Sequence, residues 1–454
     1  MLRTKLPFFL AYARAIKQPI FIEWIQSTGT QYINLGYISP ERAKTLRFVA
    51  DMSIDTTSSW RLCGTGGHLR QLYFGLSLSG AFAYGSGNID DVVSNTPGNL
   101  GIKYHYDYDV LNGLYEVSEN STIVASKQFE FSGYTGGNFY LFCYAGVNEG
   151  PLALWSGKIY SFLVYENNTL IHHLRPCLHP QTFEACMYDM VTKQYFYNKG
   201  TGSFIPAPRF VEYIESDGNQ CILDTLQIEP SHKIVIDGQY TYTGPSYQFV
   251  AGSAENDWKN QACIRLHSET TALISAGVSS DLFSINSNQR YLWTLDILNG
   301  KGYLDNNEVS SFSGFVPSGS SKWGYIGVLF NDAFYNASVG KTYSIKLYDN
   351  EVLIRHLRPC LRGNTPCMYD MVEGKYYMNA GTGTFKYGGL KVNIDYTRKQ
   401  AYIDGGMKWV LAGDASYSFL VPLTIGKNYK LVWENINSPL DGAINEIFRY
   451  GQTD

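Results

Sequence analysis

The sequence has little charge. Asp, Glu, Lys and Arg make up only 17% of its 454 residues, and the net charge is −4. This balance excludes the basic footprint that nucleic-acid binding requires. No run of about 18 apolar residues occurs, so the sequence predicts no membrane-spanning helix. Eight cysteines are too few for a disulfide scaffold in a chain of this length, and their number leaves the redox compartment open.

Tyrosine and glycine are abundant instead, with 36 and 44 copies. Aromatic residues favour strands and glycine favours turns, so the composition indicates a β-rich protein. The length predicts roughly three domains, each long enough to bury a core. The P-loop, the nucleophile elbow and the zinc-protease motif do not occur in the sequence.

The chain contains a long internal repeat. Four blocks return in the same order with a slowly shrinking offset: Phe21–Ser27 as Phe210–Ser216, Asp109–Gly113 as Asp296–Gly300, Gly157–Cys177 as Gly340–Cys360, and Cys186–Val191 as Cys367–Val372. Such an arrangement indicates two homologous domains, the second with shorter loops.

Four segments follow from this repeat: an N-terminal arm (1–18), domain one (19–207), domain two (208–388) and a small C-terminal β module (389–454). The link Pro206-Ala207-Pro208 is stiff and extended, so we expect a limited range of domain orientations. A module of about 65 residues buries only a modest part of its surface, so we expect it to dock on domain two or another subunit.

Alternating apolar and polar residues indicate half-buried strands in both copies. In the second copy the alternation places Tyr343, Ile345 and Leu347 on the inward face, and Tyr160 takes the same inward position in the first copy. This dense pattern of short strands and turns predicts an all-β protein with two antiparallel β-sandwich domains of the jelly-roll type. We expect the opening and closing blocks of each repeat to pair as neighbouring strands.

The dipeptides Asn112-Gly113 and Asn299-Gly300 stand between strand-like runs. They predict hairpins with type I′ turns, because such turns need positive φ at both central residues. The segment Asp349-Asn350-Glu351 predicts a further hairpin turn.

The opening block Phe21–Ile33, the Gly-Lys-x-Tyr-Ser segments at Gly157 and Gly340, and the closing blocks at Tyr188 and Tyr369 resemble laminin-G-like, concanavalin A-like jelly-roll domains. Such domains recur in phage tail-fibre and virion proteins and in surface proteins of gut bacteria. The resemblance covers about 370 residues and implies the fold. It does not fix the function, because the same sandwich serves lectins, adhesins, virion proteins and some glycosidases.

Three polar residues, His105, Asp107 and Asp109, alternate with tyrosines on the expected strand 103–110. They give one face two carboxylates and an imidazole, which calcium or sugar hydroxyls could use. The alternative is a solvated sheet face with the tyrosines in the core. The second copy retains only Asp296, which favours that alternative.

Loops rich in Gly, Asn, Ser and Tyr resemble adaptable recognition surfaces. Their candidate ligand-binding residues are Tyr84, Asn88, Tyr134, Asn138 and Tyr335. The same composition is also ordinary turn chemistry.

Cys177 and Cys186 recur as Cys360 and Cys367, so each repeat could hold one disulfide. Each would close a short loop and add about 2–3 kcal/mol to stability. No C-x₂-C pair accompanies them, so zinc is not expected. We expect the other four cysteines to pack as small buried hydrophobes.

Sandwich-fold glycosidases need two carboxylates across the scissile bond, usually from acidic residues at alternate strand positions. No such run is present. In the most acidic segment, Glu212 and Glu215 point to opposite faces of a strand. The sequence therefore predicts a protein that is not an enzyme.

The arm 1–18 has three interpretations. As a short helix it would present Phe9, Tyr12 and Ile16 on one apolar face, and so short a helix needs a partner. As a secretory signal it would offer the apolar stretch Leu6–Tyr12, which is short and contains a proline. It could also be a frayed terminus.

Together with these observations, the resemblance implies a non-enzymatic phage virion protein, such as a tail-fibre, receptor-binding or decoration protein. Its partners would be virion subunits, bound through the arm, and a host-surface glycan or protein. No cofactor is expected, although calcium could bind. A trimer is compatible with this role. The alternatives are a bacterial cell-surface adhesin of the same architecture and a polysaccharide hydrolase.

Overall fold

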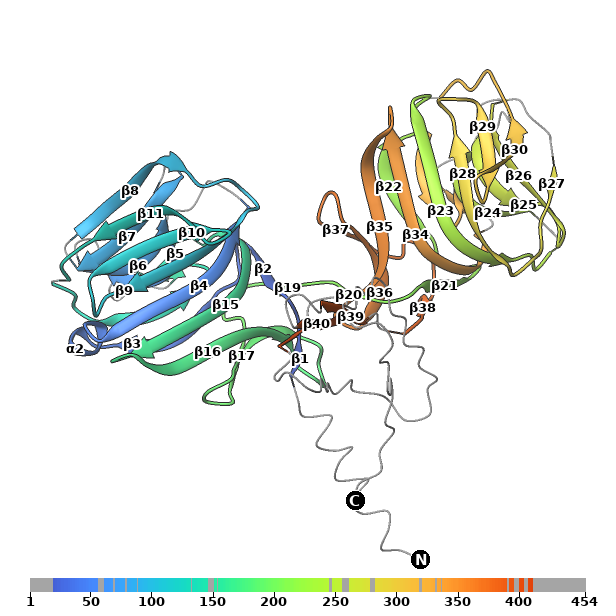
Figure 1. The fold of residues 1–454 in the computed structure, drawn as a ribbon. Coiled ribbons are helices and arrows are strands. Elements are labelled where there is room, and N and C mark those ends of the chain that lie inside the picture. Colours follow the sequence, from blue (N-terminus) through green and yellow to red (C-terminus); the bar gives the residue numbers. More distant parts are fainter. Residues whose placement is uncertain are drawn as a thin grey trace, which may run out of the picture.

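A computed structural model describes residues 19–55, 61–67, 70–77, 80–87, 89–131, 133–145, 151–152, 154–244, 247–254, 261–277, 282–317, 321–330, 333–335, 337–389, 392–395, 400–403 and 407–410. Within these ranges strands dominate, and the one helix is the short α2 (Pro40–Ala43), whose first turn is capped by the Ser39 side chain. Figure 1 shows two β-sandwiches side by side.

The first sandwich has two main sheets and a small hairpin. The larger sheet contains, in spatial order, β11 (Thr122–Gln128), β10 (Leu114–Glu119), β9 (Lys103–Asp109), β4 (Leu46–Ile54), β15 (Ser156–Glu166), β16 (Thr169–Leu178), β17 (Ala185–Asp189) and β18 (Tyr195–Phe196), joined by β1 (Ile20–Phe21), β2 (Ile25–Thr28) and β19 (Ile205–Pro206). The facing sheet contains β3 (Ile33–Ile38), β12 (Gly137–Leu141), β5 (Arg61–Gly67), β6 (Arg70–Leu76), β7 (Ala81–Gly87) and β8 (Ile89–Pro97), and the hairpin is β13 (Tyr144–Ala145) with β14 (Pro151–Leu152).

The second sandwich repeats this plan. Its larger sheet contains β30 (Asn307–Ser311), β29 (Lys301–Leu304), β28 (Arg290–Asp296), β23 (His232–Thr241), β34 (Val339–Asp349), β35 (Val352–Arg362), β36 (Thr365–Asp370) and β37 (Lys375–Tyr377), joined by β20 (Arg209–Phe210), β21 (Ile214–Asp217) and β38 (Lys386–Tyr387). The facing sheet contains β22 (Ile222–Gln227), β31 (Lys322–Tyr325), β24 (Gln248–Ala254), β25 (Ala262–Leu266), β26 (Thr271–Ala276) and β27 (Phe283–Ser284), with β32 (Val328–Phe330) and β33 (Ala333–Tyr335) alongside.

Corresponding strands of the two copies occupy the same places in their sheets, and almost all pairs are antiparallel; β24 with β32 is a parallel exception. The predicted fold class, two tandem antiparallel β-sandwiches, is confirmed. The opening strands pair with β15 and β16, so the Cys186–Val191 block lies one strand away from β1 rather than beside it. The Gly-Thr-Gly turn does reach the opening block, because the Thr201 amide donates to the Thr30 carbonyl.

Aromatic side chains from both sheets fill the first core. The Phe48 ring of β4 stacks on Phe139 of β12 at 4.6 Å, and Phe74 of β6 lies 5.9 Å from Tyr108 of β9. Buried apolar area of this kind is the main favourable term in folding. In the second core, Trp293 and Trp323 are both 1% exposed or less.

The tight turns explain several Asn residues. Type I′ geometry, with positive φ at both central residues, occurs at Asn120-Ser121, Asn167-Asn168, Asp305-Asn306 and Asn350-Glu351. The hairpins at the two Asn-Gly dipeptides also form, but the predicted turn type is wrong there. Only the glycine has positive φ, because the preceding aspartate side chain caps a longer loop.

We predict that Gly113→Ala destabilises the first sandwich by about 2 kcal/mol. Gly113 has φ of 64°, and a Cβ there would collide with the Phe129 carbonyl. The control is Gly101→Ala, whose φ of 75° is equally unfavourable but whose Cβ would meet nothing within 4 Å. Chemical denaturation measures both variants. Equal losses would show that the collision contributes nothing.

One expectation about the faces of β15 and β34 is wrong. The register shifts between Ile159 and Ser161, and a matching shift on β23 lies opposite Thr342–Ser344. These bulges turn Ile159 and Thr342 into the core and leave Tyr160 and Tyr343 half-buried on the outer face. Simple alternation cannot anticipate a bulge.

Beyond the second sandwich, β39 (Val392–Asp395), β40 (Gln400–Ile403) and β41 (Met407–Val410) form a small antiparallel sheet. The arm residues Phe9, Tyr12 and Ile16 lie outside the described residues. Among the residues that are described, no helix has the length and hydropathy to cross a membrane.

The two sandwiches touch where the chain passes from β19 to β20 (Figure 1). The Tyr376 hydroxyl donates to the Pro206 carbonyl at 2.7 Å. Phe210 and Tyr369 of the second sandwich belong to the same buried apolar cluster as Ile22 and Trp24 of the first. The junction therefore contains packed side chains as well as the linker itself.

Candidate binding surfaces

The predicted polar face on β9 exists and points outward. Tyr104, Tyr106 and Tyr108 are at most 3% exposed, so the tyrosines belong to the core. His105 is exposed and Asp107 is half-buried on the opposite face. Alternation along one strand thus places the polar residues as expected.

These polar residues form a ladder with the neighbouring strand β4. His105 Nδ1 lies 2.8 Å from Asp51 Oδ1, and Arg47 Nε donates to Asp107 Oδ1 at 2.8 Å. The hydrogen bond to Asp51 raises the pKa of His105 above 6.5, although partial burial opposes the shift. Lys103 Nζ lies 3.8 Å from the same Asp51 carboxylate. We call Arg47, Asp51, Lys103, His105 and Asp107 the charged ladder.

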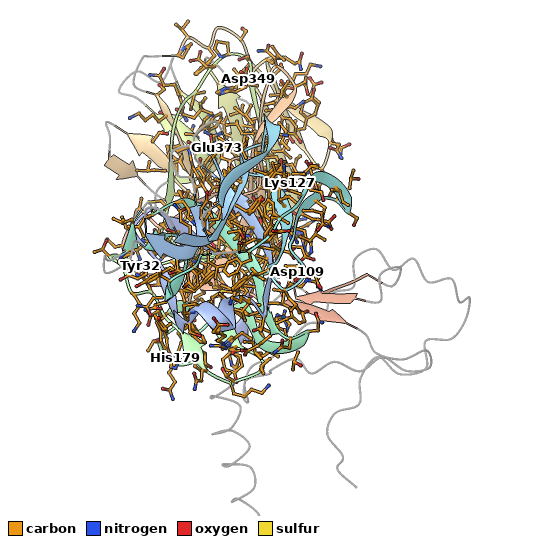
Figure 2. The ribbon with its side chains drawn as sticks, turned by 90° about the vertical axis from the view of Figure 1, so that its left-hand side faces the viewer. Tyr32, Asp109, Lys127, His179, Asp349 and Glu373 are labelled. Atoms are coloured by element: carbon orange, nitrogen blue, oxygen red, sulfur yellow. The ribbon has the colours of Figure 1, made fainter. Side chains whose placement is uncertain are left out.

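Asp109, which is labelled in Figure 2, is buried and does not belong to the exposed surface of the charged ladder, so its prediction as a ligand residue is wrong. It is 6% exposed and accepts hydrogen bonds from the Asn112 amide at 3.0 Å and the Asn112 side chain at 2.7 Å. Asp296 and Asn299 repeat this arrangement. The Asp recurs in both copies because it caps the turn.

The loop tyrosines are also corrected. Tyr84 is 1% exposed and packs 4.8 Å from Phe129, while Tyr134 is 6% exposed with its hydroxyl directed at the Ile38 carbonyl. Both serve the core, because a tyrosine beside a turn can still fold inward. Asn138 is exposed on β12 and stays a candidate. Asn88 and the Tyr335 side chain lie outside the described part.

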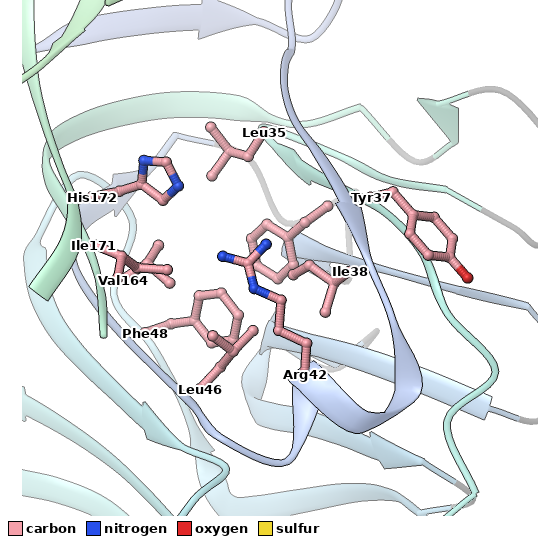
Figure 3. Close-up of a pocket in the computed structure, with 10 residues that line it drawn as sticks. Leu35, Tyr37, Ile38, Arg42, Leu46, Phe48, Val164, Ile171 and His172 are labelled. Carbon is pink, nitrogen blue, oxygen red and sulfur yellow. The ribbon is translucent and has the colours of Figure 1, made fainter. Parts of the chain in front are cut away.

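A small pocket lies between the helix α2 and strands β3, β4 and β16 (Figure 3). His172 and Arg42 border it, and most other lining side chains are apolar, such as Leu35, Phe48 and Ile171. Its volume of about 30 Å³ is small.

The structure reveals a cation and aromatic arrangement that appears in both copies and that sequence reasoning missed. In the first, Lys158 lies 4.6 Å above Trp24 and Lys103 lies 4.9 Å above Tyr160. In the second, the corresponding pairs are Lys341 above Tyr213 at 4.5 Å and Arg290 above Tyr343 at 3.7 Å. Such contacts each add about 0.5–1 kcal/mol at exposed sites. The bulges described above put Tyr160 and Tyr343 on the outer face, where Lys103 and Arg290 contact them.

The two predicted cysteine pairs are adjacent. Cys177 faces Cys186 across β16 and β17, Cys360 faces Cys367 across β35 and β36, and the sulfur atoms of each pair are 3.5 Å apart as free thiols. Burial raises the pKa of the Cys177 and Cys360 thiols. The other four cysteines are buried, as expected.

The described residues contain no group of three or more His, Cys, Asp or Glu side chains that could hold a metal ion. On the charged ladder, Lys103 engages Asp51 and Arg47 engages Asp107 instead. The ladder therefore offers charged donors and acceptors to a polar ligand.

No known protein-family profile matches the chain, and no curated protein does. Among solved structures, domains LG4-5 of the mouse laminin alpha1 chain are similar over 74% of this chain and 92% of theirs, with 11% identity and a TM-score of 0.33. The NanB sialidase from Streptococcus pneumoniae is similar over 83% of this chain and 77% of its own, with 11% identity and a TM-score of 0.22. Likenesses this weak carry no functional argument.

Proposed function

We propose that this chain is a non-enzymatic virion protein, a tail-fibre, receptor-binding or decoration protein that binds host-surface glycans or neighbouring virion subunits through its sandwiches. The observation that supports binding is the charged ladder on the first sandwich. Its polar groups line two adjacent strands, β4 and β9, and face outward. The virion setting is an expectation from the sequence resemblance.

The ladder suits sugar recognition for a simple reason. Arg47 and Asp107 form a two-point pair, and their side chains are 38% and 19% exposed. A guanidinium and a carboxylate held side by side present donors and acceptors at fixed spacing, which matches neighbouring sugar hydroxyls. Because the groups already satisfy one another, a ligand gains affinity only where it adds bonds to their free positions.

We predict that Arg47→Ala lowers affinity for a host capsule or mucin glycan at least about tenfold, a loss of 1.4 kcal/mol. The measurement is glycan binding by the intact chain in a surface assay. Arg290→Ala is the matched control, since Arg290 forms a two-point pair with Asp237 on the second sandwich, outside the charged ladder. Unchanged binding by Arg47→Ala would remove the ladder from the proposal.

Two alternatives need different observations. A cell-surface adhesin would be found on bacteria and not in purified phage particles. A polysaccharide hydrolase would release reducing ends from the same glycan, whereas a binding protein would not. If addition of calcium or a chelator changes affinity, the ligand site includes a metal.

A further inference from the structure

Each sandwich has a small aromatic surface on the outer side of the sheet next to its first strand. We call it the aromatic end surface. Its members in the second sandwich and their counterparts in the first are Phe210 and Phe21, Tyr369 and Tyr188, and Tyr376 and Tyr195.

In the second sandwich this surface is covered. Phe210 and Tyr369 are only 6% and 7% exposed, and both belong to the apolar cluster of the first sandwich. The Tyr376 hydroxyl donates to the carbonyl of Pro206, four residues before Phe210. The cover is thus made by the first sandwich and by the chain segment that leads directly into β20.

In the first sandwich the same surface is built with the same geometry. The ring centroids of Phe21 and Tyr188 are 6.1 Å apart, against 6.2 Å in the second copy. Those of Tyr188 and Tyr195 are 4.9 Å apart, as in the second copy. Arg175 lies over Phe21, as Arg358 lies over Phe210. Two surfaces with the same construction are suited to the same kind of cover.

The first surface lacks its hydrogen-bond acceptor among the described residues. The Tyr195 hydroxyl is buried and has no partner there, and Phe21 and Tyr188 are only half-buried. A buried polar atom without a partner costs about 1–3 kcal/mol. An acceptor from a segment beyond the described residues would remove that cost.

We propose that residues Tyr12–Gln18 lie across the aromatic end surface of the first sandwich, with the Lys17 carbonyl accepting the Tyr195 hydroxyl. The repeat sets this register. Aligning Phe21 with Phe210 places Lys17 at the position of Pro206, and Pro19 at that of Pro208. Proline fixes φ in the same way at both places.

Two facts favour this segment over a second copy of the chain. It is joined to β1, so its effective concentration at the surface is in the millimolar range. Within the chain, the end of the first sandwich covers the aromatic end surface of the second. A second copy would have to cover the remaining surface with the equivalent end of its second sandwich. There the chain's own continuation is already bound, because the Glu212 amide donates to the Gly389 carbonyl.

Photocrosslinking tests the proposal directly. The full chain carries p-benzoylphenylalanine in place of Tyr195, and peptide mass spectrometry of a mixture of isotope-labelled and unlabelled protein identifies the linked peptides. We expect crosslinks to 12–18 of the same molecule. Links between labelled and unlabelled chains, or links elsewhere only, would overturn the proposal.

Hydrogen exchange supplies the second measurement and does not depend on the unnatural residue. Deleting residues 1–17 should speed exchange about tenfold in β17 and β18 and leave β36 and β37 unchanged. Tyr195→Phe should give a smaller increase in the same strands. Tyr376→Phe is the matched control, with its effect confined to β36 and β37. Unchanged exchange in the deletion variant would also overturn the proposal.

Discussion

Replacing Asp189 with alanine is expected to lower the free energy of unfolding of the first sandwich by about 3 kcal/mol. The carboxylate is fully buried at the end of β17. It accepts hydrogen bonds from the His172 ring at 2.7 Å, the Thr192 hydroxyl at 2.7 Å and the amides of His173 and Val191 at 2.9 Å each. Alanine would leave all four donors without this acceptor. Thermal or urea denaturation measures the loss.

Asp189→Asn separates the loss of the hydrogen bonds from the backbone amides from the loss of those from the His172 and Thr192 side chains. An asparagine oxygen still accepts from the backbone amides, but its amino group faces the His172 and Thr192 donors. We therefore expect about half the loss. In the second sandwich, Asp370 accepts from the amides of His356 and Val372, so Asp370→Ala should destabilise that sandwich similarly. A loss below about 1 kcal/mol for Asp189→Ala would contradict this account.

The same carboxylate gives the stability a dependence on pH. Burial alone would raise the pKa of Asp189, but the hydrogen bonds from Thr192, His172 and the two amides outweigh it and lower the pKa to about 2. The folded pKa is thus below the unfolded value of 3.8. Its contribution of about 2 kcal/mol is present above pH 4 and is lost as the pH falls toward 2. Asp189→Asn should lack this loss.

Oxidation of the two cysteine pairs has the second largest expected effect. With a small-molecule disulfide such as oxidised glutathione, each pair loses two hydrogens, forms one S–S bond and reduces the oxidant to two thiols. The pairs face each other directly on adjacent strands, which puts their Cα atoms about 5.5 Å apart, within the range for a disulfide. Each closed loop should raise the free energy of unfolding by about 2–3 kcal/mol.

Mass spectrometry after alkylation counts the oxidised pairs, and denaturation with and without reductant measures the gain. Cys186→Ala keeps Cys360 and Cys367 intact. Oxidation of this variant should therefore stabilise only the second sandwich. Reaction will be slow, because the raised pKa values leave little thiolate. Full alkylation of all cysteines after prolonged oxidation would show that the strands hold the sulfur atoms apart.

Much of the fold could be predicted because its information is local or repeated. Alternation along β9 put its tyrosines inside and His105 outside, since side chains on a strand alternate between faces. The duplicated blocks predicted two sandwiches, and the cysteine pairs did prove to be neighbours. Each of these features depends on spacing along one chain segment.

The predictions that failed depend instead on contacts between separate segments. Tyr84 and Tyr134 lie near turns, and only the packing of two sheets decides that their rings enter the core. Tyr160 turns outward because of one bulge in the register between β15 and β4. A bulge is a property of a strand pair, so no single segment encodes it visibly.

By itself, then, the sequence determined the β-rich class, the duplication and the polar face of β9, because periodicity and repetition are written along the chain. Only the tertiary structure decided that Asp109 caps a turn, that Arg47 and Asp51 complete the charged ladder, and that the first sandwich covers one of two matching aromatic surfaces. Those outcomes depend on contacts between residues dozens to hundreds of positions apart, and such contacts form only when the sheets pack.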